Sequence, residues 1–140
     1  MVKNFHGSQI NQTATIVEQA GVEIADCRNR IMKFDENGKV VLATAGTDIP
    51  VGIAIIEAGY NDISGVESGK VIAGADVDIQ IKDIGFVIAG AEIKKGQEVA
   101  AGANGKAVVA TTGNYVLGIA LNTVAADGYC NVQIAKYKKA

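Results

Sequence analysis

The chain repeats a stretch of about twenty residues, and this repeat limits its fold more than any other feature. Residues 37–56 read NGKVVLATAGTDIPVGIAII, and residues 104–121 read NGKAVVATTGNYVLGIAL. Both open on Asn-Gly-Lys, continue through Ala-Thr-x-Gly and, after one insertion in the earlier copy, share Gly-Ile-Ala. Upstream, AGVEI at 20–24 mirrors AGAEI at 89–93. Internal repetition indicates a duplicated supersecondary unit, so we expect two related β-modules.

Short β-prone runs separated by glycine-containing turns predict a mainly β chain, a small barrel or sandwich. The Asn-Gly pairs at 37–38 and 104–105 are typical of type I′ hairpin turns, in which both central residues have positive φ. Strict alternation over 77–82 predicts a half-buried strand. We expect one β domain over 20–140, with repeats at about 20–82 and 89–135. Helix is expected at most as a short segment within 15–20 or 123–126.

Composition excludes several classes of function. The 140 residues carry a formal charge of −2, which argues against a phosphate-binding surface. No apolar run is long enough to span a bilayer, and the N-terminus has no signal-peptide core. Cys27 and Cys130 lack metal-site or redox spacing, so we expect free thiols made in a reducing cytoplasm. A disulfide stays open as an alternative if the two lie on neighbouring strands.

Residues 1–19 are polar and rich in Asn and Gln, and such a segment buries too little apolar surface to order alone. They predict an extended N-terminal arm. The arm is either a frayed end or a segment that orders against another subunit through Phe5 and Ile10.

The residues needed for catalysis are scarce. His6 is the only histidine and lies in the arm, and no serine has a nucleophile-elbow setting. Asp76 and Asp78 share a strand face that is more typical of a solvated side than of a cation site. The KKGQ turn at 94–97 is similar to a turn of biotinyl or lipoyl carriers, but the Met-Lys-Met sequence that carries the modified lysine there is absent from this chain. We therefore expect no enzyme activity, no catalytic or metal site and no cofactor.

Residues 89–123 resemble the capsid decoration (cement) proteins of tailed bacteriophages. Typical motifs of that family correspond here to Ile93–Val99, Asn104–Lys106, Thr111–Gly113 and Gly118–Ala120. The likeness extends over 89–134, returns through the duplication at 20–56 and is faint over 1–19 and 59–75. These motifs are structural turns, so they identify a scaffold more directly than a function.

The resemblance implies a structural virion protein, made in the host cytoplasm, that binds the outer surface of a phage head and cements neighbouring major capsid subunits. It implies a homotrimer with the major capsid protein as partner and with no nucleic acid or membrane contact. The arm then supplies the capsid-interface candidates Val2, Lys3, Phe5, His6 and Ile10.

The alternative is a tail, baseplate or surface module that binds host glycan. Glycan sites usually stack sugars on exposed aromatic rings, and the loop candidates for this are Tyr60, Tyr115 and Tyr129. Aromatic residues make up only 5% of the chain, which ranks this reading second.

Overall fold

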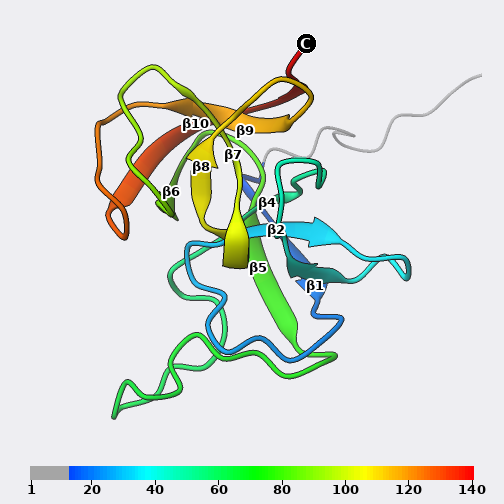
Figure 1. Ribbon diagram of the computed structural model, residues 1–140. Helices are drawn as coiled ribbons and strands as arrows, with labels where there is room; N and C mark the ends of the chain where they lie inside the picture. Colours follow the sequence, from blue (N-terminus) through cyan, green and yellow to red (C-terminus); the bar gives the residue numbers. More distant parts are fainter. Residues whose placement is uncertain (1–12) are drawn as a thin grey trace, which may run out of the picture.

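The computed structural model describes residues 13–140 and is mainly β (Figure 1), which confirms the predicted fold class. A single 3-10 turn, η1 (Ala103–Gly105), accompanies the strands of the described chain. The strands are β1 (Thr15–Gln19), β2 (Ile31–Phe34), β3 (Val40–Leu42), β4 (Gly52–Ala54), β5 (Asp76–Gln80), β6 (Ile84–Ile88), β7 (Glu98–Ala101), β8 (Ala107–Val109), β9 (Tyr115–Ala120) and β10 (Tyr129–Lys138).

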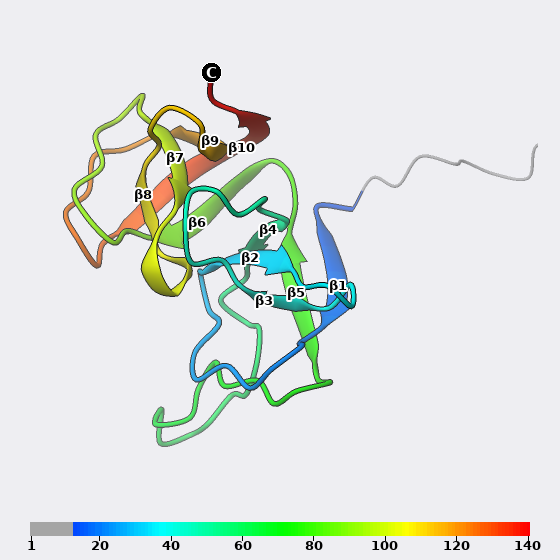
Figure 2. The same cartoon turned by 45° about the vertical axis from the view of Figure 1, so that its right-hand side comes forward.

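Two five-stranded antiparallel sheets have the same strand order. Module 1, residues 15–80, forms the sheet β1-β5-β4-β2-β3, and module 2, residues 84–138, forms β6-β10-β9-β7-β8. Advancing every strand number in the first order by five gives the second. The two sheets lie as adjacent lobes in Figures 1 and 2. The repeat read in the sequence is therefore a repeat of topology.

Contacts outside the strands repeat as well. The parallel bridge between Ala20 and Val40 in module 1 has its counterpart between Ala89 and Ala107 in module 2. The antiparallel bridge between Ile24 and Val71 likewise matches that between Ile93 and Val124. These pairs make AGVEI and AGAEI equivalent in space as well as in sequence.

The glycine of each Gly-Ile-Ala motif is required by close packing of backbones. A Cβ on Gly52 would lie 2.0 Å from the carbonyl oxygen of Gln80, and a Cβ on Gly118 would lie 2.0 Å from that of Gln133. No real Cβ approaches a backbone oxygen so closely, so any side chain here would push β4 from β5 or β9 from β10. The motif shared by the two repeats marks this contact.

The modules share a hydrophobic core. Module 1 has a cluster of its own that includes Met32, Val77 and Ile79. The cluster centred on module 2, around Leu117, also takes in residues of module 1, namely Ile31, Ala43 and Ile53. Backbone hydrogen bonds from Ile88 to Asn29 and from Tyr115 to Gly46 tie the two further. The two modules are therefore packed against one another through shared core residues.

Local details differ from the sequence-based expectations. Residues 15–19, assigned to the arm, form β1, because their partly buried Ile16 and Glu18 face the sheet beside β5. Neither proposed helical segment is helical.

The two Asn-Gly turns also differ from one another. Asn104 and Gly105 both have positive φ, as predicted for a type I′ turn, but at the first turn only Gly38 does. There the Asp35 carboxylate accepts hydrogen bonds from the amides of Asn37 and Lys39, which favours a different turn.

Candidate interaction surfaces

The largest difference between the modules is one connection. Sixteen residues (55–70) link Ala54 of β4 to the bridge residue Val71, whereas three (121–123) link the equivalent Ala120 and Val124. We call residues 55–70 the insertion loop. It projects at the lower left of Figures 1 and 2, away from both sheets.

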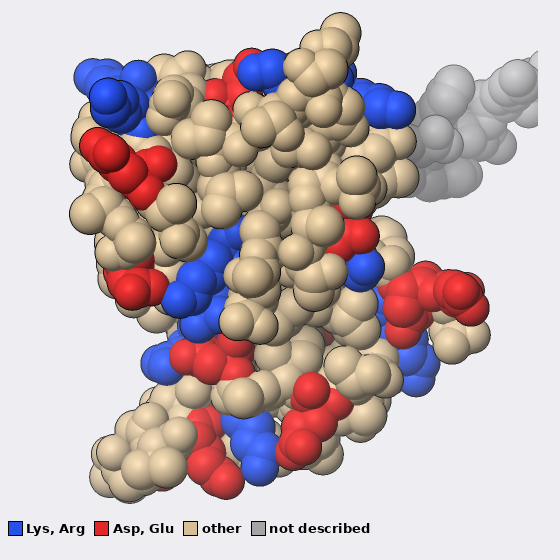
Figure 3. Space-filling model, viewed as in Figure 1, with Lys and Arg blue, Asp and Glu red and all other residues tan. Residues whose placement is uncertain are grey.

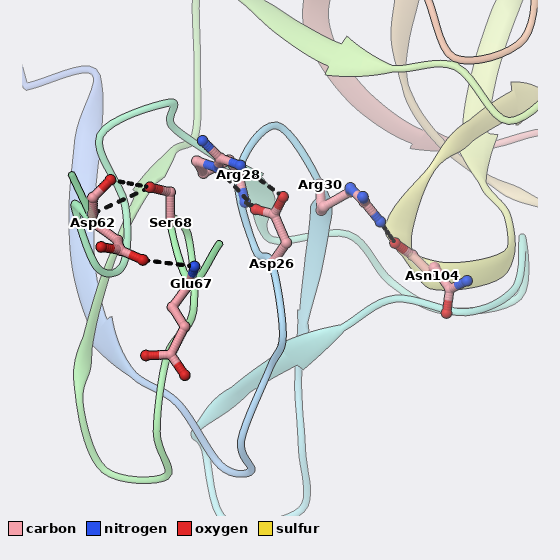
Figure 4. Close-up of polar contacts among 7 residues, drawn as sticks. All are labelled: Asp26, Arg28, Arg30, Asp62, Glu67, Ser68 and Asn104. Atoms are coloured by element: carbon pink, nitrogen blue, oxygen red, sulfur yellow. Dashed lines mark hydrogen bonds and ion pairs between the residues drawn. The ribbon is translucent and has the colours of Figure 1, made fainter. Parts of the chain in front are cut away.

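Asp62 organises the tip of the insertion loop. Its carboxylate accepts hydrogen bonds from the Ser64 hydroxyl at 2.6 Å, the Ser64 amide at 3.1 Å and the Glu67 amide at 3.0 Å. These bonds hold the pKa of Asp62 below its usual value. The Ser68 hydroxyl oxygen accepts a hydrogen bond from the Asp62 amide at 3.1 Å (Figure 4). Such side-chain bonds order a turn without help from a hydrophobic core.

The neck of the loop is fixed to the body of module 1. The Tyr60 amide donates to the Lys70 carbonyl, the Tyr60 carbonyl accepts from the Gly69 amide, and the Cys27 amide donates to the Gly69 carbonyl at 3.0 Å. Arg28 pairs with Asp26 at 2.9 Å and lies against Gly69, where a Cβ would fall 2.1 Å from an Asp26 carboxylate oxygen (Figure 4). The tip is therefore attached to module 1 through the hydrogen bonds and packing of the neck.

The tip itself presents apolar side chains to solvent. Ile63 is fully exposed, with a relative accessibility of 106%, and Val66 reaches 85%. In Figure 3 the outermost part of the projection at the lower left is uncharged, with acidic side chains beside it. An ordered loop that exposes two aliphatic side chains has already lost much of the entropy that binding would cost, which favours a contact role.

A groove lies on the other side of module 1, next to β1. It has a volume of about 620 Å³, and a smaller hollow of about 280 Å³ continues it along β10 past Ile49 and Pro50. We call the larger one the lysine groove. Its lining is mostly apolar, with two lysines and one aspartate: Ile16, Lys33, Phe34, Thr47, Asp48, Ile49, Pro50, Val51, Ile81 and Lys136.

The charges of the lysine groove are unequal. Lys33 and Asp48 form an ion pair at 3.0 Å. Burial raises the pKa of Asp48, but hydrogen bonds from the Thr44 amide, Lys33 and the Ala45 amide outweigh it, and the net shift is downward. Lys136 donates to the Val51 carbonyl at 2.8 Å, and burial lowers its pKa. No carboxylate in the described chain pairs with Lys136, so the groove has one uncompensated positive charge.

A cleft of about 490 Å³ separates the two modules near β6. Phe86 and Tyr129, exposed by 54% and 52%, form one wall, and Ile56 and Glu57 form part of the other. Phe86 lies on β6 opposite Asn131 of β10, and Tyr129 lies two residues before Asn131. The cleft therefore combines aromatic rings with a carboxylate and a strand edge.

The tyrosines proposed for glycan stacking are dispersed. Tyr60 lies in the insertion loop, Tyr115 lies beneath the Lys138 ammonium at 5.6 Å, and only Tyr129 lines the cleft between modules. The sequence did not indicate that Phe86 lies near Tyr129. The two residues come together only through the register of β6 with β10.

The basic C-terminal residues are part of β10 and its contacts. Lys139 pairs with Glu98 at 2.8 Å, and the Tyr137 hydroxyl donates to the same carboxylate. Hydrogen bonds from Lys139 and Tyr137 lower the pKa of Glu98. These lysines hold β10 against β7 and β9, so they are less available than a solvated tail would be.

Both cysteines are free and buried. Burial raises the pKa of the Cys27 thiol to about 11 and raises that of Cys130. Asp76 and Asp78 border a shallow pocket beside Tyr60. Within residues 13–140, no three His, Cys, Asp or Glu side chains are grouped to hold a metal ion, and no helix there is long and apolar enough to cross a membrane.

The capsid-interface candidates Val2, Lys3, Phe5, His6 and Ile10 lie outside the described residues. The chain enters the described region at Thr13, and the Ala14 carbonyl accepts a hydrogen bond from the amide of Ile81. Ile81 also lines the lysine groove, so Ala14, near the start of the described chain, lies beside a residue of that groove.

Comparison with solved structures identifies a neighbour from a phage head. The fold is similar to the N base of the head fiber protein gp8.5 of bacteriophage phi29, with a TM-score of 0.61 and 20% sequence identity. The match covers 90% of this chain and 97% of the head-fiber chain. No family model and no curated protein matches the sequence. At this identity the likeness shows that the two chains share a fold, which here includes both modules.

Proposed function

We propose that this chain is a structural protein of a phage virion that binds the outer surface of the head and cements neighbouring major capsid subunits. The observation that carries this proposal is the similarity to the phi29 head-fiber base over nine tenths of the chain. The motifs that resemble decoration proteins support the same location. The protein acts by adhesion and not by catalysis.

The architecture suits such a role. A rigid body of aliphatic residues sets the spacing between contacts, and several contacts of about 1,600 Å² each can act together. Once one contact forms, later ones become intramolecular and strengthen binding by about 10²–10⁴. We propose that residues 1–12 provide one of these contacts through Val2, Phe5 and Ile10, with Lys3 and His6 beside them.

We further propose a homotrimer. The edge strands β1, β3, β6 and β8 leave backbone groups that a neighbouring copy can cover. Three copies around a three-fold axis would match the positions where three capsid subunits meet.

Cosedimentation with purified expanded heads of the cognate phage tests the proposal. The protein should bind saturably and raise the temperature at which the heads rupture. Deletion of residues 1–12, which leaves β1 intact, should weaken binding, as should Phe5→Ser combined with Ile10→Ser. Asn4→Ser combined with Gln9→Ser, in the same segment, is the matched control. Absence of binding to heads would refute the head assignment, and undiminished binding of the deletion would refute only the arm.

Glycan binding is the second candidate, favoured by Tyr129 and Phe86 in one cleft with Glu57. Stacking on these rings predicts retention on host surface polysaccharide that is lost in Tyr129→Ala. Retention on polysaccharide without binding to heads would reverse the order of the two candidates.

A further inference from the structure

We propose that the insertion loop of one copy docks in the lysine groove of a second copy, with Ile63 and Val66 seated on the apolar floor and an acidic loop side chain near Lys136. The loop and the groove are thus the two halves of one self-association contact. The resulting ring of three rests on the function proposed above, but the pairing of loop and groove does not require a head.

The first argument is apolar complementarity. The tip is an ordered projection whose two aliphatic side chains are exposed to solvent, with accessibilities of 106% and 85%. The groove is an open hollow of about 620 Å³ walled by apolar side chains, of which Phe34 and Ile49 are themselves exposed by 47% and 62%. The apolar area of both surfaces is removed from water only if another surface covers it, and docking of the tip in the groove would cover both.

Charge selects this groove over the cleft between modules. The insertion loop contains Glu57, Asp62, Glu67 and Lys70, a net charge of −2. The cleft is bordered by Glu57 with no lysine or arginine in its lining, so an acidic loop would meet a like charge there. The lysine groove has two lysines against one aspartate, a net charge of +1, and its Lys136 has no carboxylate partner in the described chain. Opposite charges across an interface fix the choice of partner and the register.

Within the loop, Glu67 is the best placed acid. The Asp62 carboxylate is occupied by the turn bonds of the tip. Glu67 is 55% exposed, and its one ion pair, to Lys70, is 3.3 Å long. Glu67 follows Val66 directly, so a tip seated in the groove brings its carboxylate to the rim, where Lys136 lies.

The two surfaces lie on opposite sides of the molecule, which determines the symmetry. The insertion loop is at the lower left of Figure 1, whereas β1 and the end of β2, which border the groove, are on the right. The loop of one copy therefore cannot fill the groove of the same copy. For the same reason, two copies cannot each place their loop in the groove of the other around a two-fold axis. A contact between different surfaces repeats from copy to copy and closes into a ring when the rotation allows.

Cysteine pairing between two variants tests the contact directly. Both native thiols are buried, so they do not interfere. Full-length Ile63→Cys and Ile49→Cys, mixed under mild oxidation, should give a crosslinked heterodimer. Ile63→Cys mixed with Val22→Cys, an exposed site that lines neither surface, should give none. Equal crosslinking in both mixtures, or none in the first, overturns the proposal.

Sedimentation velocity provides the second readout. The wild-type chain should form an oligomer, and Ile63→Ser with Val66→Ser should weaken its association by about 100-fold, since each lost apolar contact is worth about a factor of ten or more. Val22→Ser is the control, because it removes an exposed apolar side chain that lies outside both surfaces. Glu67→Lys should weaken association too, and mixing it with Lys136→Glu should restore mixed oligomers. A wild-type monomer at high concentration, or an oligomer unaffected by the tip substitutions, overturns the pairing.

Binding to heads separates this inference from the proposed function. If the oligomer depends on loop and groove while the wild type ignores heads, the contact stands and the virion role falls. If heads bind the wild type and the tip variant equally and no crosslink forms, the role stands and the contact falls.

Discussion

Module 1 and module 2 have the same skeleton and different connections. Both pair five strands in the same order, both place a glycine where a Cβ would be 2.0 Å from a backbone oxygen, and both close the same pair of bridges. Only module 1 carries the insertion loop, and only module 2 has a long last strand, β10, of ten residues against the five of β5. The shared parts hold each sheet together. Of the parts that differ, the insertion loop projects from the body, and the extension of β10 contacts β9 and module 1.

This division indicates where each module's sequence was free to change. Positions packed between strands must keep their size, whereas a connection at a sheet end lengthens at little cost in free energy. Evidence that the modules fold separately would contradict the shared core. Exchange of the parts that differ would test whether those parts are needed for the fold.

The largest effect should come from the core that the modules share. Ile53 is 1% exposed and packs into the cluster centred on module 2, so Ile53→Ala should cost about 2–5 kcal/mol of unfolding free energy. Because that cluster joins both sheets, hydrogen exchange should accelerate in β5 and in β10 together. Exchange that accelerates in module 1 alone would mean that the two modules unfold independently. Ile63→Ala, at the exposed tip, should leave stability nearly unchanged.

The paired glycines test the equivalence of the modules. Gly52→Ala and Gly118→Ala should each destabilise by about 1–3 kcal/mol, because the new Cβ must displace a neighbouring strand. Gly90→Ala should cost less, since its nearest neighbour is the Cβ of Lys106 at 3.1 Å. Urea unfolding of the three variants measures this. A neutral result at either motif glycine would contradict the close approach there.

Exchange of the connection separates fold from contact. Replacing residues 55–70 with Leu-Asn-Thr, the connection of module 2, should leave both sheets intact by circular dichroism. Loop closure becomes cheaper by about 1.5 kcal/mol. Loss of the buried Ala58 and of the bond from Cys27 to Gly69 offsets this gain. Stability should therefore change by less than about 2 kcal/mol, while self-association falls to that of the tip variant. Collapse of module 1 would show that the loop is part of its core.

The smallest effect on global stability should come from Asp62. Asp62→Ala removes the acceptor of the tip bonds, so amides of residues 63–68 should exchange faster while the global free energy of unfolding stays nearly unchanged. In the wild type the lowered pKa means that tip order persists above the ordinary value of 3.8 and is lost as the pH falls through the lowered one. Exchange at residues 63–68 that does not change with pH would contradict this role of Asp62.

The sequence predicted the parts of the fold that depend on local pattern and repetition. The duplicated Asn-Gly-Lys and Gly-Ile-Ala motifs led to two related β-modules, and the same strand order in both sheets confirms that pairing. The expected repeats begin at about residues 20 and 89, whereas the modules begin earlier in the sequence, with β1 and β6. These two strands are joined to their modules only by long-range pairing with β5 and β10. Thr15–Gln19 alternates too weakly to be distinguished from the polar residues before it.

The surfaces were less predictable. The glycines at 59, 65 and 69 indicate a turn-rich segment within the insertion loop, but its order comes from Asp62 and from Arg28, which is more than thirty residues earlier. The lysine groove draws residues from β1, β2, the 44–51 connection and β10, and no local pattern brings these together. Contacts between distant segments follow from the topology, and local sequence pattern does not determine which strands pair.

The position of β10 has a mechanical consequence. It lies between β6 and β9 in the interior of its sheet and also reaches module 1 through Lys136 and Val51. Its hydrogen bonds run across the strand, so a pull along the strand loads those bonds in shear, all at once. A pull across the sheet would open them one after another. The direction of an applied force, more than the number of contacts, would then determine how long this fold survives under tension.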